Sequence, residues 1–236
     1  MSKGKAERGS QRNIQCLFNH PKNRRLLERK LKTHIADWLS PIDSDQYREY
    51  QDEDFLQQIG LGRCSGQLVG EFWPKGGPVW DGLAKTNDGT VLLFEAKAHI
   101  SELFGGGMKA KAKTSRETIL KSLAEAAEFI GADYDAASWT DAMYQTANRL
   151  AHLFFLNKKI GVKAKLIYLI FLNDDTVASH GETEEMWKTA IEVAERYILK
   201  LPLGRKAKFK DGSSGSWRDW VNHVFIDIKG SDFTII

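Results

Sequence analysis

Hydrophobic residues recur along much of the 236-residue chain with the spacing of helices or of strands. Near the N-terminus, Leu27, Leu31, Ile35 and Trp38 follow one another at intervals of three or four residues. This spacing places them on one face of a helix. The pattern therefore predicts an amphipathic helix over residues 22–39.

Further patterns of this kind predict helices and strands along the rest of the chain. In order they are a short helix through Phe55 and Leu56, a strand over 66–73, helices over 114–130 and 138–157, a central strand over 163–172, a helix over 182–199, a short helix from Ser216 and a strand over 224–228. Thr114 and Glu117 have the spacing of a capping box. Strands interleaved with helices of these lengths indicate an α/β fold. We expect a disordered basic tail over 1–12 and a single domain over 13–236.

A β-hairpin is the clearest prediction, with strands over 78–86 and 90–99 around Asn87-Asp88-Gly89. If these three residues form the loop, with Gly89 in the left-handed conformation, Thr86 lies opposite Thr90. Asp81 then lies opposite Glu95, and it shares a face with Glu95 and Lys97 because side chains alternate along a strand. A two-residue turn would instead place Asp81 opposite Ala96.

The predicted register places the carboxylates of Asp81 and Glu95 next to each other. Like charges directly opposed across a sheet repel and raise one pKa, so a cation is needed between them. Magnesium is commonly held by one or two carboxylates, with water and phosphate completing its shell, and manganese is a candidate substitute. Asp81, Glu95 and the carbonyl of Ala96 are the candidate ligands. Lys97 would orient a water or stabilise developing negative charge, which suits phosphodiester hydrolysis. The alternative is a surface salt bridge, although the strand around Glu95 and Lys97 is otherwise apolar.

Asp81 on the first strand of a hairpin, followed by Glu95-Ala96-Lys97 on the second, resembles the signature of the PD-(D/E)xK nuclease superfamily. The match departs from the motif because Val79 and Trp80 separate Pro78 from the acid. The resemblance implies a restriction-endonuclease-like core, in which a central mixed β-sheet has helices on both faces. It also implies a magnesium-dependent nuclease in which Asp81 and Glu95 hold the metal and Lys97 serves the water.

Two more positions gain a role from the resemblance. The family often has an acidic residue on its first helix near the metal, and Glu28 is the candidate, with Glu71 and Glu102 as competitors. Some branches carry a glutamine on the helix after the hairpin, and Gln145 resembles it as a catalytic residue. Arg149 lies nearly on the same helix face. A polar stripe on a half-exposed helix is the alternative for Gln145 and Arg149.

The net charge of +3 is small, but basic residues occur in separate blocks, at residues 1–30, 109–116 and 200–210. Such blocks suit a polyanionic partner. The glycine-rich segment that starts at Gly105 is predicted to bind a nucleic-acid backbone because it precedes a cluster of cations. We expect DNA as the partner in preference to RNA. With the addition of Arg149 from the later helix, the candidate contacts are Lys109, Lys111, Lys113, Arg116 and Arg149. A non-cleaving nucleic-acid-binding module, or a protein unrelated to nucleic acid, remains an alternative to the nuclease.

Several other classes of protein are disfavoured. The two cysteines form no disulfide framework, which indicates a reducing compartment, the cytoplasm. No apolar stretch approaches the length of a membrane span. The chain has no P-loop, zinc-protease or serine-hydrolase motif. The sequence leaves the oligomeric state open, a homodimer included.

Overall fold

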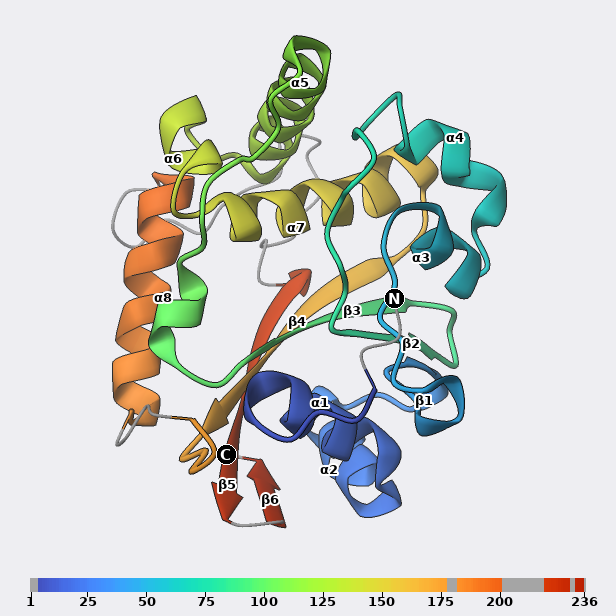
Figure 1. The fold of residues 1–236 in the computed structure, drawn as a ribbon, viewed down its shortest axis with the longest axis vertical. Coiled ribbons are helices and arrows are strands. Elements are labelled where there is room, and N and C mark those ends of the chain that lie inside the picture. The colour runs from blue at the N-terminus through green and yellow to red at the C-terminus, as the bar shows by residue number, and fades with distance from the viewer. Residues whose placement is uncertain (1–3, 178–181, 201–218, 230–231, 236) are drawn as a thin grey trace.

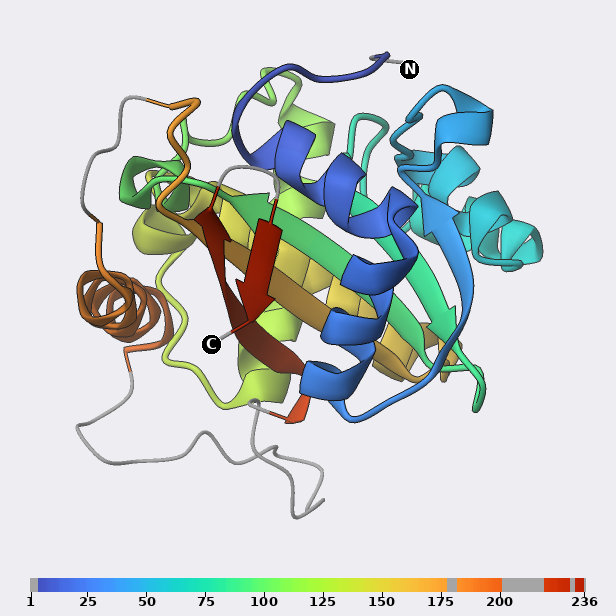
Figure 2. The same cartoon turned by 90° about the horizontal axis from the view of Figure 1, so that it is seen from below.

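The computed structural model describes residues 4–177, 182–200, 219–229 and 232–235. It shows an α/β protein with one curled, six-stranded mixed sheet (Figures 1 and 2). The strands lie in chain order, β1-β2-β3-β4-β5-β6. Their bounds are Ile35–Ser40, Gly82–Thr86, Val91–Lys97, Ala164–Leu172, Val221–Lys229 and Asp232–Ile235. β3 and β5 run parallel to β4, and the other neighbouring strands are antiparallel.

Eight α-helices lie within these residues. They are α1 (Gly9–Asn19), α2 (Pro21–Leu31), α3 (Asp52–Gln58), α4 (Ser65–Leu68), α5 (Lys113–Ile130), α6 (Ala136–Thr140), α7 (Tyr144–Phe154) and α8 (Glu184–Leu199). Short 3-10 turns cover Asp43–Asp45, Gly62–Cys64 and Ile100–Leu103, and a π-helical turn over Phe155–Ile160 extends α7. No helix in the described part of the chain is long and apolar enough to cross a membrane.

Helices cover both faces of the sheet, and each face has its own hydrophobic core (Figure 2). On one side, Phe18 of α1 packs edge-on against Phe94 of β3, with ring centroids 5.0 Å apart. On the other side, α5, α7 and α8 share a core with Leu93 of β3 and Tyr168 of β4. The alternation of side chains along β3 and β4 fills both cores. The prediction of a central mixed sheet with helices on both faces is therefore confirmed.

The hairpin has the predicted register. Gly89 has a φ of 80°, and the Thr86 amide donates to the Thr90 carbonyl at 3.0 Å. The last pair of the hairpin is Gly82 with Phe94, so the predicted pairing of Asp81 with Glu95 lies one position beyond the residues that pair. A β-carbon at Gly82 would lie 3.0 Å from the ring of Phe18, so the close approach of α1 requires glycine at this position.

Several predicted elements are wrong. The helix predicted over 22–39 ends at Leu31, and Ile35 and Trp38 belong to β1. Residues 66–73 contain the end of α4 and a turn instead of a strand. α1 begins at Gly9, inside the predicted tail, because Ile14, with its neighbours Leu17 and Phe18, is buried against the sheet.

Two predictions near the helices need similar corrections. α5 begins at Lys113 without a side-chain cap, so the capping box at Thr114 is absent. The helix predicted over 138–157 is divided into α6 and α7. The predicted central strand over 163–172, the helix ending at Leu199 and the later strand are all present. The predicted helix at Ser216 and most of the block at 200–210 lie outside the described residues.

Candidate active site

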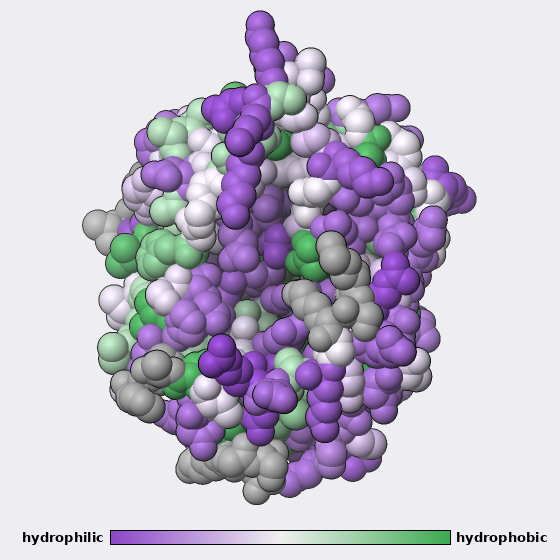
Figure 3. All heavy atoms as spheres, viewed as in Figure 1, coloured by the Kyte–Doolittle hydropathy of each residue, from purple (hydrophilic) through white to green (hydrophobic). Residues whose placement is uncertain are grey.

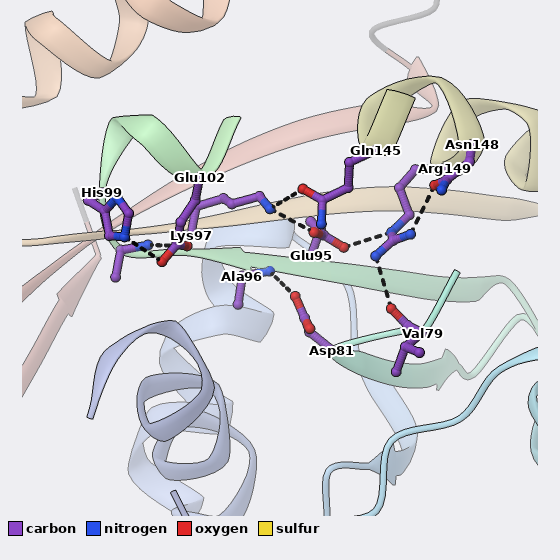
Figure 4. Close-up of polar contacts among 11 residues, drawn as sticks. Val79, Asp81, Glu95, Ala96, Lys97, His99, Glu102, Gln145, Asn148 and Arg149 are labelled. Carbon is purple, nitrogen blue, oxygen red and sulfur yellow. Dashed lines mark hydrogen bonds and ion pairs between the residues drawn. The ribbon is translucent and has the colours of Figure 1, made fainter. Parts of the chain in front are cut away.

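Glu95 and Lys97 project from β3 toward α7, on the same face of the sheet (Figure 4). Their relative exposures are only 2% and 5%. Charged side chains buried to this degree require partners, because losing water around a charge is costly. The structure supplies those partners from β3 itself and from α7.

Glu95 is held by two cations. Lys97 Nζ lies 2.8 Å from Glu95 Oε1, and Arg149 Nε lies 2.7 Å from Glu95 Oε2. Lys97 Nζ also donates to Gln145 Oε1 at 2.7 Å. Gln145 and Arg149 reach the same site because residues four apart lie on one face of a helix. Burial raises the pKa of Glu95, but Arg149 and Lys97 outweigh it and bring this pKa below its usual value.

Arg149 has two further contacts besides its ion pair with Glu95. Its Nη2 donates to the Val79 carbonyl at 3.0 Å, and its guanidinium lies 5.1 Å from the centroid of the Trp80 ring. Although burial lowers the pKa of Arg149, the carboxylates of Glu95 and Asp81 raise it above its usual value. Arg149 therefore joins α7 to β3 and to the segment before β2.

Asp81 lies at the edge of β3 (Figure 4). Its Oδ2 accepts a hydrogen bond from the Ala96 amide at 2.8 Å. The segment before β2 does not pair with β3. One residue before Asp81, the Trp80 amide donates to the Tyr50 carbonyl instead. Because backbone amides of a strand lie in the plane of the sheet, the carboxylate sits at the strand edge rather than above the face that carries Glu95. This placement differs from the shared face that alternation alone predicts.

Asp81 and Glu95 still influence each other. Burial raises the pKa of Asp81 to about 7, and the negative charge of Glu95 contributes to the rise. Lys97, the Ala96 amide and Arg149 act in the opposite direction without cancelling it. Of the two carboxylates, Asp81 is thus the one with insufficient positive charge around it.

The donor chemistry of this site suits a magnesium ion. Asp81 supplies an undercompensated carboxylate, and Glu95 supplies a second one that acts on its pKa but has both oxygens bound, by Lys97 and by Arg149. The Ala96 carbonyl faces the same edge as its amide, because both groups of an extended residue point to the same neighbouring strand. Across the described ranges, no group of three His, Cys, Asp or Glu side chains is arranged to hold a metal. Two carboxylates and one carbonyl are nevertheless enough for an ion that retains water and binds phosphate.

The structure does not bring Glu28 to this site. Glu28 is on α2, where its Oε1 accepts from the Ile35 amide at 2.8 Å and lies 2.7 Å from His34 Nδ1. It stabilises the turn between α2 and β1. Glu102 is closer to the hairpin, where its Oε2 accepts from the Ala98 amide at 3.1 Å and its Oε1 lies 3.1 Å from His99 (Figure 4).

A cleft of about 600 Å³ lies beside the carboxylates. Its walls are the segments 73–79 and 105–112, and α7 contributes Tyr144, Gln145, Asn148 and Arg149. The face shown in Figure 3 is hollowed near its centre, and hydrophilic residues gather around the hollow. Only some of the predicted nucleic-acid contacts line this cleft. Lys109 and Lys111 do, whereas Lys113 and Arg116 lie on the first turns of α5. Arg149 reaches the cleft but is committed to Glu95.

Two residues that sequence reasoning missed help to build the site. Asp52 accepts hydrogen bonds from the amides of Gly76 and Gly77 at 2.9 and 2.8 Å. It thereby holds the segment that carries Val79. Tyr168 is the neighbour of Glu95 on β4 and is buried at 5% exposure. Neither residue belongs to a local motif, so their roles emerge only once distant segments are in contact.

Comparisons with protein-family models, curated proteins and solved structures found no match.

Proposed function

We propose that this chain is a metal-dependent nuclease that hydrolyses phosphodiester bonds, with DNA favoured over RNA. The observation that carries the proposal is that buried Asp81 lies near enough to Glu95 and Lys97 for both charges to act on its pKa, with too little positive charge around it to offset its burial. Like-charged carboxylates that act on each other in this way are unfavourable unless a cation or a function retains them. A restriction-endonuclease-like core is part of the same proposal. The hairpin β2-β3, whose second strand is central in the sheet, has helices before and after it, and this arrangement supports it.

Asp81, Glu95 and the Ala96 carbonyl would hold the ion. When bound, magnesium polarises a phosphoryl oxygen and lowers the pKa of a coordinated water. Manganese is the expected substitute because it shares the preference for oxygen ligands.

Lys97 has a distinct role in the proposed reaction. An ammonium has three N–H donors, and two of them are directed at Glu95 and Gln145. The third donor is left to orient the attacking water or to stabilise negative charge that develops on the phosphate. Gln145 acts as a positioning residue, because it holds Lys97 Nζ from the side of α7.

One observation favours a second candidate, a nucleic-acid-binding module that does not cleave. Both oxygens of Glu95 are already engaged, by Lys97 and by Arg149, so this carboxylate is satisfied without a metal. For the nuclease to work, the pairing of Glu95 with Arg149 must loosen enough for Glu95 to share an oxygen with the ion. The two candidates differ in whether divalent ions produce cleavage.

A cleavage assay separates them. The purified chain is incubated with supercoiled plasmid, linear duplex and single-stranded DNA, in magnesium, manganese or chelator. The nuclease predicts product in magnesium or manganese on at least one substrate and none in chelator. Binding of DNA without cleavage under every condition would support the binding module instead. Equal cleavage in chelator would contradict metal dependence.

A further inference from the structure

The charged side chains that line the cleft are all positive. Among the described residues that line it, the charged ones are Lys75, Lys109, Lys111 and Arg149, and none is an aspartate or glutamate. The whole chain has 31 acidic residues against 34 Lys and Arg, so a lining with no acid departs from the average of the molecule. Arg149 is paired with Glu95, and the three lysines are the cations that a ligand would meet. Such a lining suits a polyanion.

The cations come from both segments that form the walls. Lys75 belongs to the segment 73–79, and Lys109 and Lys111 belong to the segment 105–112. All three lysines are exposed, so their ammonium groups are available to a ligand. A strand of nucleic acid lying between the walls would have its phosphates neutralised from both sides.

The floor of the cleft offers a ring and amide groups. Tyr144 at the start of α7 is half-buried, and it lines the cleft beside Gln145 and Asn148. A tyrosine ring can stack on any base, and such stacking does not require a particular sequence. Five positions in the walls are glycines (Gly76, Gly77, Gly105, Gly106 and Gly107), and at these positions a nucleic-acid backbone can approach closely because no side chain is present.

The cleft also leads to the proposed catalytic groups. Gln145 and Arg149 line it and contact Lys97 and Glu95, which are themselves almost fully buried. A phosphodiester must therefore descend between the walls to reach them. A volume of about 600 Å³ is in the range of clefts that enclose a drug-sized ligand. That volume accommodates one or two nucleotides of a separated strand between the walls.

We propose that this cleft binds single-stranded nucleic acid, with Lys75, Lys109 and Lys111 on the phosphates and Tyr144 stacked on a base. The inference rests on the proposed function, because it specifies the form of substrate that the nuclease accepts. It predicts action on single strands, or on frayed or unpaired ends of a duplex, in preference to intact duplex. The experiment decides between a deoxyribose and a ribose backbone, since phosphate neutralisation and stacking are common to DNA and RNA.

The test measures binding in chelator, so that cleavage does not interfere. Fluorescence anisotropy follows labelled single strands of about 12 nucleotides, one of DNA and one of RNA, and a blunt duplex of the same sequence. The expected result is affinity for at least one single strand about tenfold or more above that for the duplex. The triple variant Lys75→Ala/Lys109→Ala/Lys111→Ala should bind that strand about tenfold or more weakly. The slope of its log binding constant against log salt concentration should be smaller in magnitude by about 2.

A matched triple variant controls for net charge. Lys121, Lys163 and Lys165 are also exposed but do not line the cleft. Their replacement by alanine removes the same charge and should leave binding close to wild type. Tyr144→Leu should weaken binding about tenfold, whereas Tyr144→Phe keeps the ring and should bind nearly as well as wild type.

The outcomes separate this inference from the proposed function. Equal or tighter binding of the duplex, or an equal loss in both triple variants, overturns the single-strand cleft even if the chain cleaves DNA in magnesium. Selective single-strand binding that depends on the cleft lysines supports it even if no cleavage occurs.

Discussion

Arg149 and Glu95 form a buried ion pair across the interface of α7 and β3, with 2.7 Å between Arg149 Nε and Glu95 Oε2. The two side chains are 6% and 2% exposed. Lys97 binds the other oxygen of Glu95 from the same strand. Arg149 therefore contributes both to the charge balance of the proposed active site and to the attachment of the helix that carries Gln145.

Arg149→Met should destabilise the fold substantially. The substitution leaves Glu95 buried with a single cation, and loss of one partner from a buried pair costs about 3 kcal/mol or more. The measurement is the free energy of unfolding in urea at neutral pH. Arg48→Met is the matched control, because Arg48 also lies 2.7 Å from a carboxylate, that of Asp54, but both side chains are exposed. The control should lose about 0.5 kcal/mol. Similar losses in the two variants would contradict the burial argument.

Asp81→Asn should stabilise the metal-free protein at alkaline pH. The folded pKa of Asp81 is about 7, above its usual value of 3.8, so the folded state binds more protons between these values. Stability is therefore lost as the pH rises toward 7, and asparagine removes this loss while it can still accept from the Ala96 amide. At pH 8 in chelator we expect a gain on the order of 2 kcal/mol.

Asp81→Asn also tests whether Asp81 binds magnesium. Magnesium should raise the unfolding temperature of the wild type, because an ion that binds only the folded state stabilises it. Asp81→Asn should show little or no such rise. A variant less stable than wild type at pH 8 in chelator, or one with an undiminished response to magnesium, is incompatible with the assignment of Asp81.

His152 should make the protein sensitive to mild acid. It is buried against Trp73 and hydrogen-bonded to the Asn148 carbonyl, and burial lowers its pKa from 6.5 to about 3. Between these values the unfolded chain binds the proton and the folded chain does not, so stability falls as the pH drops below 6.5. The slope is at most about 1.4 kcal/mol per pH unit.

His152→Gln isolates this contribution. The difference in unfolding free energy between wild type and variant should be constant above pH 7 and should shift against the wild type as the pH falls from 6.5 to 4. Equilibrium urea unfolding at several pH values provides the curve. A difference that does not change with pH would rule out a neutral buried histidine.

Gly107→Ala should distort the wall of the cleft. A β-carbon at Gly107 would lie 2.7 Å from the Thr140 carbonyl oxygen, which is backbone and cannot move aside easily. The adjacent Gly106→Ala is the control, since the nearest atom there is the end of Lys109 at 3.9 Å. We expect a loss of about 1–3 kcal/mol for Gly107→Ala and a much smaller change for Gly106→Ala. Thermal unfolding of both variants checks this, and equal stability would contradict the close packing of this loop.

Local signals predicted the hairpin well. Asn87-Asp88-Gly89 set the loop length, and the loop length fixed which residues of β2 and β3 face each other. Periodicity was less informative near the N-terminus. Leu31 ends a helix and Ile35 starts an edge strand, yet both place apolar side chains inward. The interval between apolar residues therefore stays helix-like across the boundary between α2 and β1 and does not reveal it.

The candidate site was predictable only in part. Glu95 and Lys97 share a face because they are two residues apart on a strand, whereas Asp81 lies at the strand edge because the chain diverges at Trp80. The pairing of Arg149 with Glu95 depends on how α7 crosses β3. That crossing is set by packing between segments 54 residues apart, which no local pattern encodes.

Cleavage by two single variants of the hairpin decides whether it is the active site. Wild type, Asp81→Asn and Lys97→Met are compared on a labelled single strand and on plasmid in magnesium, after circular dichroism confirms that all three are folded. We expect the wild type to cleave, chelator to abolish that cleavage, and each variant to cleave about a hundredfold or more slowly. Cleavage by either variant at the wild-type rate would contradict the assignment of this hairpin as the active site.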